Sequence, residues 1–324
     1  MEDPPPERED TVQHLYHRGL SLLQNRSYEK AEVVFGKVLE KAPGFVLALY
    51  CRGACRLALG GYPEALGDFD AFIRVRPGSA KAIALRGRTY LALERYAEAE
   101  LDLQKALEIM PGQRGWIWDL DQAKMLKRGN ETAGVGKVFP KLALQAAHKQ
   151  GDGARWEVSG GRLVPLLSAS SRIEKTLCGG PGYRGLLLLC VPRADHPLDL
   201  ARLSELSEYL TDIQKRGLTV VTVFPSPPEA LWKLKDGKEL SFPLFSDPNG
   251  KAAWQLGVLD VRFREQGQPL PTLFFIDDKG VIRIRRTFLD PGRRTPLEKV
   301  LQEIDRLCKK ETPPGEEKEK KPGK

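Results

Sequence analysis

Residues 53–77 read GACRLALGGYPEALGDFDAFIRVRP, and three of these positions recur at a fixed spacing on both sides. Gly53, Ala65 and Pro77 each have a copy 34 residues earlier and another 34 residues later. The copies are Gly19, Ala31 and Pro43 on one side and Gly87, Ala99 and Pro111 on the other. A period of this length is typical of stacked helical hairpins, because each pair of helices buries its apolar face only against its neighbours.

The recurring residues indicate how one hairpin is built. Gly lies where the first helix crosses the second too closely for a Cβ, Ala does the same on the second helix, and Pro ends that helix because it has no N–H to donate. The period and runs such as Ala65 to Phe69 resemble the tetratricopeptide repeat, a family whose usual role is binding rather than catalysis. We therefore expect a helical solenoid over residues 12–129, with repeats at 12–45, 46–79 and 80–113 and a polar capping helix at 113–129.

The composition is that of an ordinary globular protein with room for two cores. The chain has 324 residues, of which 41% are apolar and 29% charged. Its formal charge of +8 is scattered among acidic residues, which argues against nucleic-acid binding. No run of 18 apolar residues is present to span a membrane, and the acidic, Pro-rich start is unlike a leader, so we expect a cytoplasmic protein. Residues 1–11 and 309–324 are expected to be disordered.

A change of pattern follows the repeats. Gly-rich segments bracket a short helical pattern from Lys141 to His148, so residues 130–154 are expected to be a linker containing one helix. A second domain is expected over residues 155–308.

The second domain has the pattern of an α/β fold. The apolar runs 185–191 and 218–224 predict strands buried on both faces, and residues 198–214 carry Leu and Ile at helical spacing between them. A strand, helix, strand unit of this kind predicts parallel strands with a right-handed crossover. A hairpin with an Asp-Asp-Lys-Gly turn is expected over 272–286, and a closing helix over 298–307.

Three strings in this region resemble the thioredoxin fold of the alkyl hydroperoxide reductase and thiol-specific antioxidant (AhpC/TSA) family of peroxiredoxins. They are LLLCVPRADHP at 187–197, FSDPNG at 245–250 and PTLFFIDDKGVI at 271–282. The resemblance implies an α plus α/β chain, in which the three-repeat solenoid is followed by a thioredoxin-like α/β sandwich.

The same resemblance argues against peroxidase activity. The family carries a Cys in the first turn of the helix after its Pro-containing loop, where the helix N-terminus and an Arg stabilise the thiolate that attacks peroxide. Placing Pro192 on the family's Pro puts His196 where a Thr belongs and Asp199 where the Cys belongs, and Pro271 replaces the Arg. We therefore expect a degenerate site at His196, Asp199 and Pro271 with no catalytic residue and no cofactor. The resemblance also implies a cis bond from Leu270 to Pro271.

The remaining residues offer other candidate chemistries. Cys178 lies in a Gly-rich loop and Cys190 in an apolar strand, so the alternative function is a thiol peroxidase or reductase that uses one of them. The absence of a Cys-X-X-Cys motif excludes a thioredoxin-type dithiol. Asp195, His196 and Asp199 could ligate a metal, but such residues more often cap a helix, so no metal is expected.

The concave face of the repeats is the predicted binding surface for a protein or peptide partner. Residues expected to line this groove are Gln13, Tyr16, Leu20, Leu47, Tyr50, Ala54, Lys81, Ala84 and Arg88. In the alternative interpretation, Tyr16 and Tyr50 only pack within the stack.

The chaperone tail that some tetratricopeptide repeats clamp is a poor fit to this groove. Those proteins use Lys, Asn and Arg at positions that here hold Tyr16, Leu20, Cys51, Lys81 and Leu85, of which only Lys81 matches. A segment with apolar side chains and an acidic group near Lys81 and Arg88 is the better expectation. The sequence leaves open a homodimer through the thioredoxin-like domain.

Overall fold

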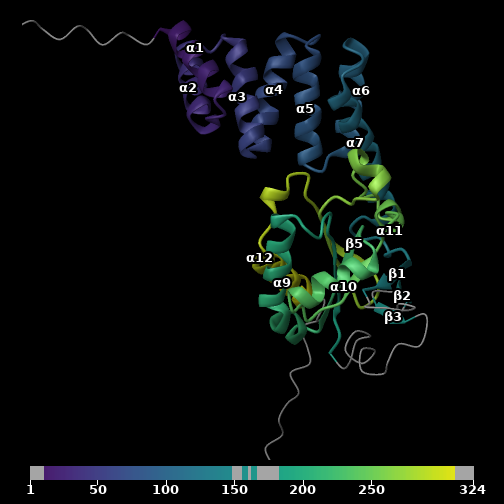
Figure 1. The fold of residues 1–324 in the computed structure, drawn as a ribbon. Coiled ribbons are helices and arrows are strands. Elements are labelled where there is room, and N and C mark those ends of the chain that lie inside the picture. Colours follow the sequence, from purple (N-terminus) through teal and green to yellow (C-terminus); the bar gives the residue numbers. More distant parts are fainter. Residues whose placement is uncertain (1–10, 148–154, 160–161, 166–181, 311–324) are drawn as a thin grey trace, which may run out of the picture. The chain divides into compact units, whose positions relative to one another are not determined.

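The computed structural model describes residues 11–147, 155–159, 162–165 and 182–310 (Figure 1). The chain divides into two compact units, the first ending at Lys127 and the second beginning at Arg128, and each has its own apolar core. None of the helices in the described ranges combines the length and the apolar character needed to cross a bilayer.

The first unit is the expected series of helical hairpins. Each repeat supplies two antiparallel helices of 13 or 14 residues, and a longer helix follows them. The helices are α1 (Val12–Gln24), α2 (Tyr28–Lys41), α3 (Val46–Leu59), α4 (Tyr62–Val75), α5 (Ala80–Ala92), α6 (Tyr96–Ile109) and α7 (Arg114–Ala133).

The recurring glycines allow the two helices of each hairpin to touch. A Cβ built on any of the three would collide with the large apolar residue at the matching position of the second helix. The distances from that Cβ to the nearest side-chain atom are 2.6 Å for Gly19 and Phe35, 3.0 Å for Gly53 and Phe69, and 2.9 Å for Gly87 and Leu103.

Two of the three hairpins are also joined by a repeated ion pair. Arg86 donates two hydrogen bonds to Asp102, of 2.7 and 2.8 Å, and Arg52 donates two to Asp68, of 3.0 and 2.6 Å. Both aspartates are buried. In the first repeat the corresponding positions hold Arg18 and Val34, so that hairpin cannot form the pair.

This difference between repeats provides a matched pair of substitutions. Arg86→Met should lower the free energy of unfolding by about 2 kcal/mol, because Asp102 is left buried without its cation. Arg18→Met, at the corresponding position of the first repeat, should change it by less than about 0.5 kcal/mol. Urea unfolding of the full chain, followed by circular dichroism, measures both. Equal effects of the two substitutions would contradict a structural role for the repeated pair.

The second unit is built on one mixed sheet. Its strands are β1 (Leu142–Ala146), β2 (Arg155–Ser159), β3 (Arg162–Pro165), β4 (Gly185–Cys190), β5 (Leu218–Phe224), β6 (Leu244–Ser246), β7 (Thr272–Asp277) and β8 (Ile282–Thr287). Its helices are α9 (Pro197–Lys215), α10 (Pro228–Gly237), α11 (Lys251–Gln255) and α12 (Leu297–Lys310), with short 3₁₀ turns at Val261–Gln266 and Pro291–Arg293.

The order of strands across the sheet is β3-β2-β1-β6-β5-β4-β7-β8. As predicted, β4 and β5 are parallel and are joined through α9, while β7 and β8 form an antiparallel hairpin. Helices α9 and α12 pack against the sheet through Leu203, Leu206, Val300 and Ile304. The outcome is the expected α/β sandwich, with the carboxyl end of β4 leading directly into α9.

The prediction of a helix in the linker is wrong. Residues 142–146 form strand β1, which pairs antiparallel with β2 and also with β6. Leu142 and Leu144 alternate with exposed or half-exposed residues, and this period-two pattern suits a strand with one buried face. Three antiparallel strands that the sequence analysis did not identify therefore extend the sheet.

The prediction of a cis bond before Pro271 is also wrong, because no cis peptide occurs among the described residues. Leu270 donates its N–H to the carbonyl of Val258 at 2.6 Å, and its own carbonyl accepts the Thr272 hydroxyl at 3.1 Å. Both backbone groups of Leu270 are therefore hydrogen-bonded with the peptide in the trans form, which X–Pro bonds favour by about 0.5–1 kcal/mol.

Candidate functional site

The candidate site begins where β4 ends and α9 starts. Pro197 is the first residue of α9, a position at which its missing N–H removes no helical hydrogen bond. Asp199 follows in the first turn, so its carboxylate lies at the positive end of the helix dipole. Its exposed fraction is only 2%. A carboxylate buried to this extent needs N–H or cationic partners to replace water.

Asp199 has both kinds of partner. The backbone N–H of Arg193 donates to one carboxylate oxygen at 3.1 Å. The guanidinium of Arg294 donates to the other oxygen and forms an ion pair with it. Arg294 is itself largely buried, with 12% of its side chain exposed, and it also donates to the carbonyl of Leu198 at 3.4 Å.

The presence of Arg294 differs from what the sequence predicts for this site. The sequence predicts that Pro271 replaces the family's Arg, but the structure has a cation, Arg294, beside position 199. It comes from the segment between the second 3₁₀ turn and α12, 95 residues further along the chain. The only signal in the sequence is the run Arg293-Arg294, which has no spacing relation to the loop before α9.

The three residues of the predicted degenerate site come together. His196, Asp199 and Pro271 line one pocket of about 200 Å³, along with Arg193 and Arg294. His196 is the N-cap residue of α9, although its side chain makes no capping hydrogen bond. Asp195 pairs with the Arg193 side chain at 3.0 Å. Within the described ranges, no group of three His, Cys, Asp or Glu side chains is arranged to hold a metal ion.

Of the two cysteines that the alternative function would use, the structure describes only Cys190. Cys178 lies outside the described residues. Cys190 is buried in β4, and this burial raises the pKa of its thiol. The carboxylate of Asp247 raises it further, while the guanidinium of Arg285 acts in the opposite direction. The thiolate needed for nucleophilic attack is thus strongly disfavoured at Cys190.

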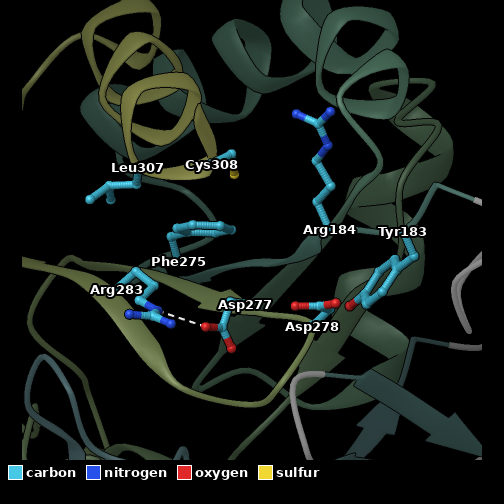
Figure 2. A pocket seen from close by; sticks show the side chains of 8 residues that line it. All are labelled: Tyr183, Arg184, Phe275, Asp277, Asp278, Arg283, Leu307 and Cys308. Atoms are coloured by element: carbon cyan, nitrogen blue, oxygen red, sulfur yellow. Dashed lines mark hydrogen bonds and ion pairs between the residues drawn. The ribbon is translucent and has the colours of Figure 1, made fainter. Parts of the chain in front are cut away.

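A second pocket lies at the other end of β4 and β7 (Figure 2). It has a volume of about 180 Å³, and its lining includes Tyr183, Arg184, Phe275 and Cys308. At one side Arg283 donates to Asp277 at 2.6 Å. None of the residues predicted for the degenerate site lines this pocket.

The tyrosines predicted for the repeat groove pack against phenylalanines. The ring centroid of Tyr16 lies 4.8 Å from that of Phe45, and that of Tyr50 lies 5.3 Å from that of Phe72. Burial raises the pKa of Tyr16 to about 12, with smaller contributions from Cys51. Both tyrosines keep part of their surface exposed, so the geometry fits the packing alternative and leaves the groove role a prediction.

The remaining groove residues vary in exposure. Gln13, Leu47, Lys81 and Arg88 are exposed, Leu20 and Ala54 are half-buried, and Ala84 is buried at 1%. Arg88 is not an isolated charge, because it forms an ion pair of 2.5 Å with Asp119 on α7. This partner is not predicted by the local sequence pattern, because it lies 31 residues further on.

Comparisons with known proteins give one matching family model in each of the two parts of the chain. The tetratricopeptide repeat model matches residues 56–114, and the AhpC/TSA family model matches residues 177–285. A curated peroxiredoxin from Hyperthermus butylicus is 38% identical over 68 residues, which are 21% of this chain and 28% of that protein. The match thus spans little more than a quarter of that relative. The chain therefore combines a tetratricopeptide-repeat module with an AhpC/TSA-like domain.

Two solved structures are similar to part of the chain. MamA (residues 41 to the end) from Desulfovibrio magneticus RS-1 is 29% identical, with a TM-score of 0.36, over 39% of this chain and 71% of that one. The first tetratricopeptide domain of Spaghetti (RPAP3), bound to an HSP90 peptide, is 19% identical, with a TM-score of 0.35, over 37% of this chain and 94% of that one. Scores this low add nothing to the assignment of function.

The position of Arg294 makes a substitution at 199 informative. In Asp199→Cys the introduced thiol should have a pKa below the ordinary value of about 8.5, because the guanidinium and the helix N-terminus favour the thiolate. The difference in ultraviolet thiolate absorbance between variant and wild type, followed against pH, measures this pKa. Adding Arg294→Met should raise it. An introduced thiol that titrates at or above the ordinary value would show that Arg294 does not act on position 199.

Proposed function

We propose that this protein is an interaction adaptor. Its repeat module holds a peptide or protein segment on the concave face, and its AhpC/TSA-like domain supplies a second surface without peroxide-reducing chemistry. The observation that carries the proposal is the state of Asp199, which occupies the position predicted for the reactive Cys and is buried in an ion pair with Arg294.

The chemistry of Asp199 supports a role other than catalysis. A carboxylate cannot attack peroxide and be oxidised as a thiolate is. Both of its oxygens are already hydrogen-bonded, one to the Arg193 N–H and the other to Arg294. The substitution keeps a negative group at the helix N-terminus and removes the nucleophile.

The charges of the repeat groove favour a partner with an acidic group. Lys81 at the start of α5 is exposed, and no described residue forms an ion pair with it in the structure. Arg88, two turns along the same helix, already forms an ion pair with Asp119, which offsets part of its positive charge. Lys81 is therefore the groove cation most available to a carboxylate of the bound segment, with the exposed Leu47 supplying apolar contact.

Reversing the charge of Lys81 tests this adaptor role. Lys81→Glu should reduce recovery of the bound partner several-fold in affinity purification with the full chain, and the loss should be largest at low salt. Lys105→Glu makes the same charge change at an exposed position on α6, which is the second helix of the repeat, and should leave recovery unchanged. If Lys81→Glu retains the partner while removal of all residues after Ala133, the end of α7, abolishes recovery, the groove is not the binding surface.

The enzyme alternative uses Cys178 or Cys190. In the form that uses Cys190 this thiol is reactive, whereas the adaptor proposal predicts an inert one. Because burial raises its pKa, the Cys190 thiol should stay unmodified when the native protein is treated with iodoacetamide at pH 8. Unfolding the protein in urea should make it react. Peptide mass spectrometry reads out each site separately. Rapid modification of Cys190 in the native state would favour the enzyme.

A further inference from the structure

An exposed tryptophan on α11 lies among arginines. Trp254 keeps 38% of its surface exposed. The guanidinium carbon of Arg128 lies 3.9 Å from the centroid of its ring, and that of Arg264 lies 5.1 Å from the same centroid. Phe263, the residue before Arg264 in the first 3₁₀ turn, is 41% exposed. These four residues are called the Trp254 patch, and aromatic side chains with arginine are the composition that interface cores and hot spots favour.

Backbone contacts hold the Trp254 patch in place. Gly250 precedes α11 and Gly267 follows the 3₁₀ turn, both with positive φ. A Cβ built on Gly250 would lie 2.5 Å from the Cα of Gly267, so the two segments approach more closely than other residues allow. Arg128, the first residue of the second unit, donates a hydrogen bond of 3.0 Å to the carbonyl of Trp254. The patch is therefore preorganised, which lowers the ordering cost of binding.

The arginines of the 3₁₀ turn differ in their partners. Arg262 is already paired with Asp260 at 2.7 Å. Arg264 is exposed, and no acid in the described part of the chain forms an ion pair with it, including the neighbouring Glu265. Its contact with the Trp254 ring orients the cation without neutralising it. Arg264 is thus a positive charge that a carboxylate from outside the chain can reach.

We propose that the Trp254 patch is the second interaction surface of the adaptor and binds an acidic segment of a partner protein that also carries apolar side chains. A carboxylate of the segment pairs with Arg264, and its apolar side chains lie against Trp254 and Phe263. This inference rests on the proposed function, which assigns such a surface to the AhpC/TSA-like domain. A second copy of the chain is disfavoured, because a symmetric contact brings the same cations together.

Two peptides that differ only in charge test the proposal. One alternates Asp, Glu and Leu, and the other has Asn and Gln in place of the acids, with the same dye on both. Fluorescence anisotropy with the full chain should show the acidic peptide binding at least about fivefold more tightly at low salt. The difference should shrink as sodium chloride is added, because salt screens exposed charges.

Variants locate the bound peptide on the chain. Arg264→Glu should weaken binding of the acidic peptide at least about fivefold. Arg306→Glu makes the same change at an exposed position on α12 and should leave binding unchanged. Trp254→Ala should also weaken binding, in a variant whose thermal unfolding matches the wild type. If Trp254→Ala unfolds the domain, Phe263→Ser tests the apolar contact at an exposed position of the turn.

Lys81→Glu separates this inference from the adaptor role, because the repeat groove is also proposed to take an acidic segment. Binding of the acidic peptide should survive Lys81→Glu. Its loss in Lys81→Glu but not in Arg264→Glu would place the peptide in the groove, which overturns the inference and leaves the adaptor role standing. If Lys81→Glu retains the adaptor's partner, the groove proposal fails while the effect of Arg264→Glu on the peptide is unaffected.

Other results would also overturn the inference. They are equal binding of the two peptides, tighter binding of a single-stranded DNA oligonucleotide than of the acidic peptide, and a wild-type dimer in sedimentation that Trp254→Ala converts to a monomer.

Discussion

A carboxylate that is almost fully buried has to be neutralised where it lies, and Asp199 is neutralised by a guanidinium from a distant part of the chain. The pair with Arg294 ties the first turn of α9 to the segment that leads into α12. The N–H of Arg193 ties the same carboxylate to the loop after β4. Removing either charge would leave the other buried and unpaired, which is the costly way to break such a pair.

This interaction links the fold of the domain to its proposed role. A helix N-terminus with a nearby cation suits an anionic side chain, whether thiolate or carboxylate. With Asp199 in place, the N-terminus of α9 and the guanidinium of Arg294 have an anionic partner, and this partner is a carboxylate instead of a nucleophilic thiolate. The cation at this position, Arg294, pairs with the carboxylate of Asp199.

Much of the architecture could be predicted from the sequence because it rests on local patterns. Gly, Ala and Pro at a 34-residue period indicated the three hairpins, and the apolar runs at 185–191 and 218–224 indicated the parallel strands. Short segments without a long pattern were harder to interpret. Residues 142–146 carry two leucines two residues apart, and so short a stretch fits a helix or a strand until its partner strands are known.

The candidate site was predictable only in part. His196, Asp199 and Pro271 were found by alignment of local strings, and they do line one pocket. Arg294 could not be found in this way, because the contact joins segments 95 residues apart and an arginine pair gives no spacing signal. The pairing of Arg88 with Asp119 was missed for the same reason. Such contacts depend on tertiary structure, which local patterns do not encode.

The most direct test of this account is the rate at which the full chain consumes hydrogen peroxide, measured by stopped-flow with excess thiol reductant. With Asp199 in an ion pair and Cys190 buried, the wild type should consume peroxide no faster than an ordinary surface thiol does. Rapid turnover by the wild type that Cys178→Ser or Cys190→Ser abolishes would contradict the account and establish the protein as an enzyme.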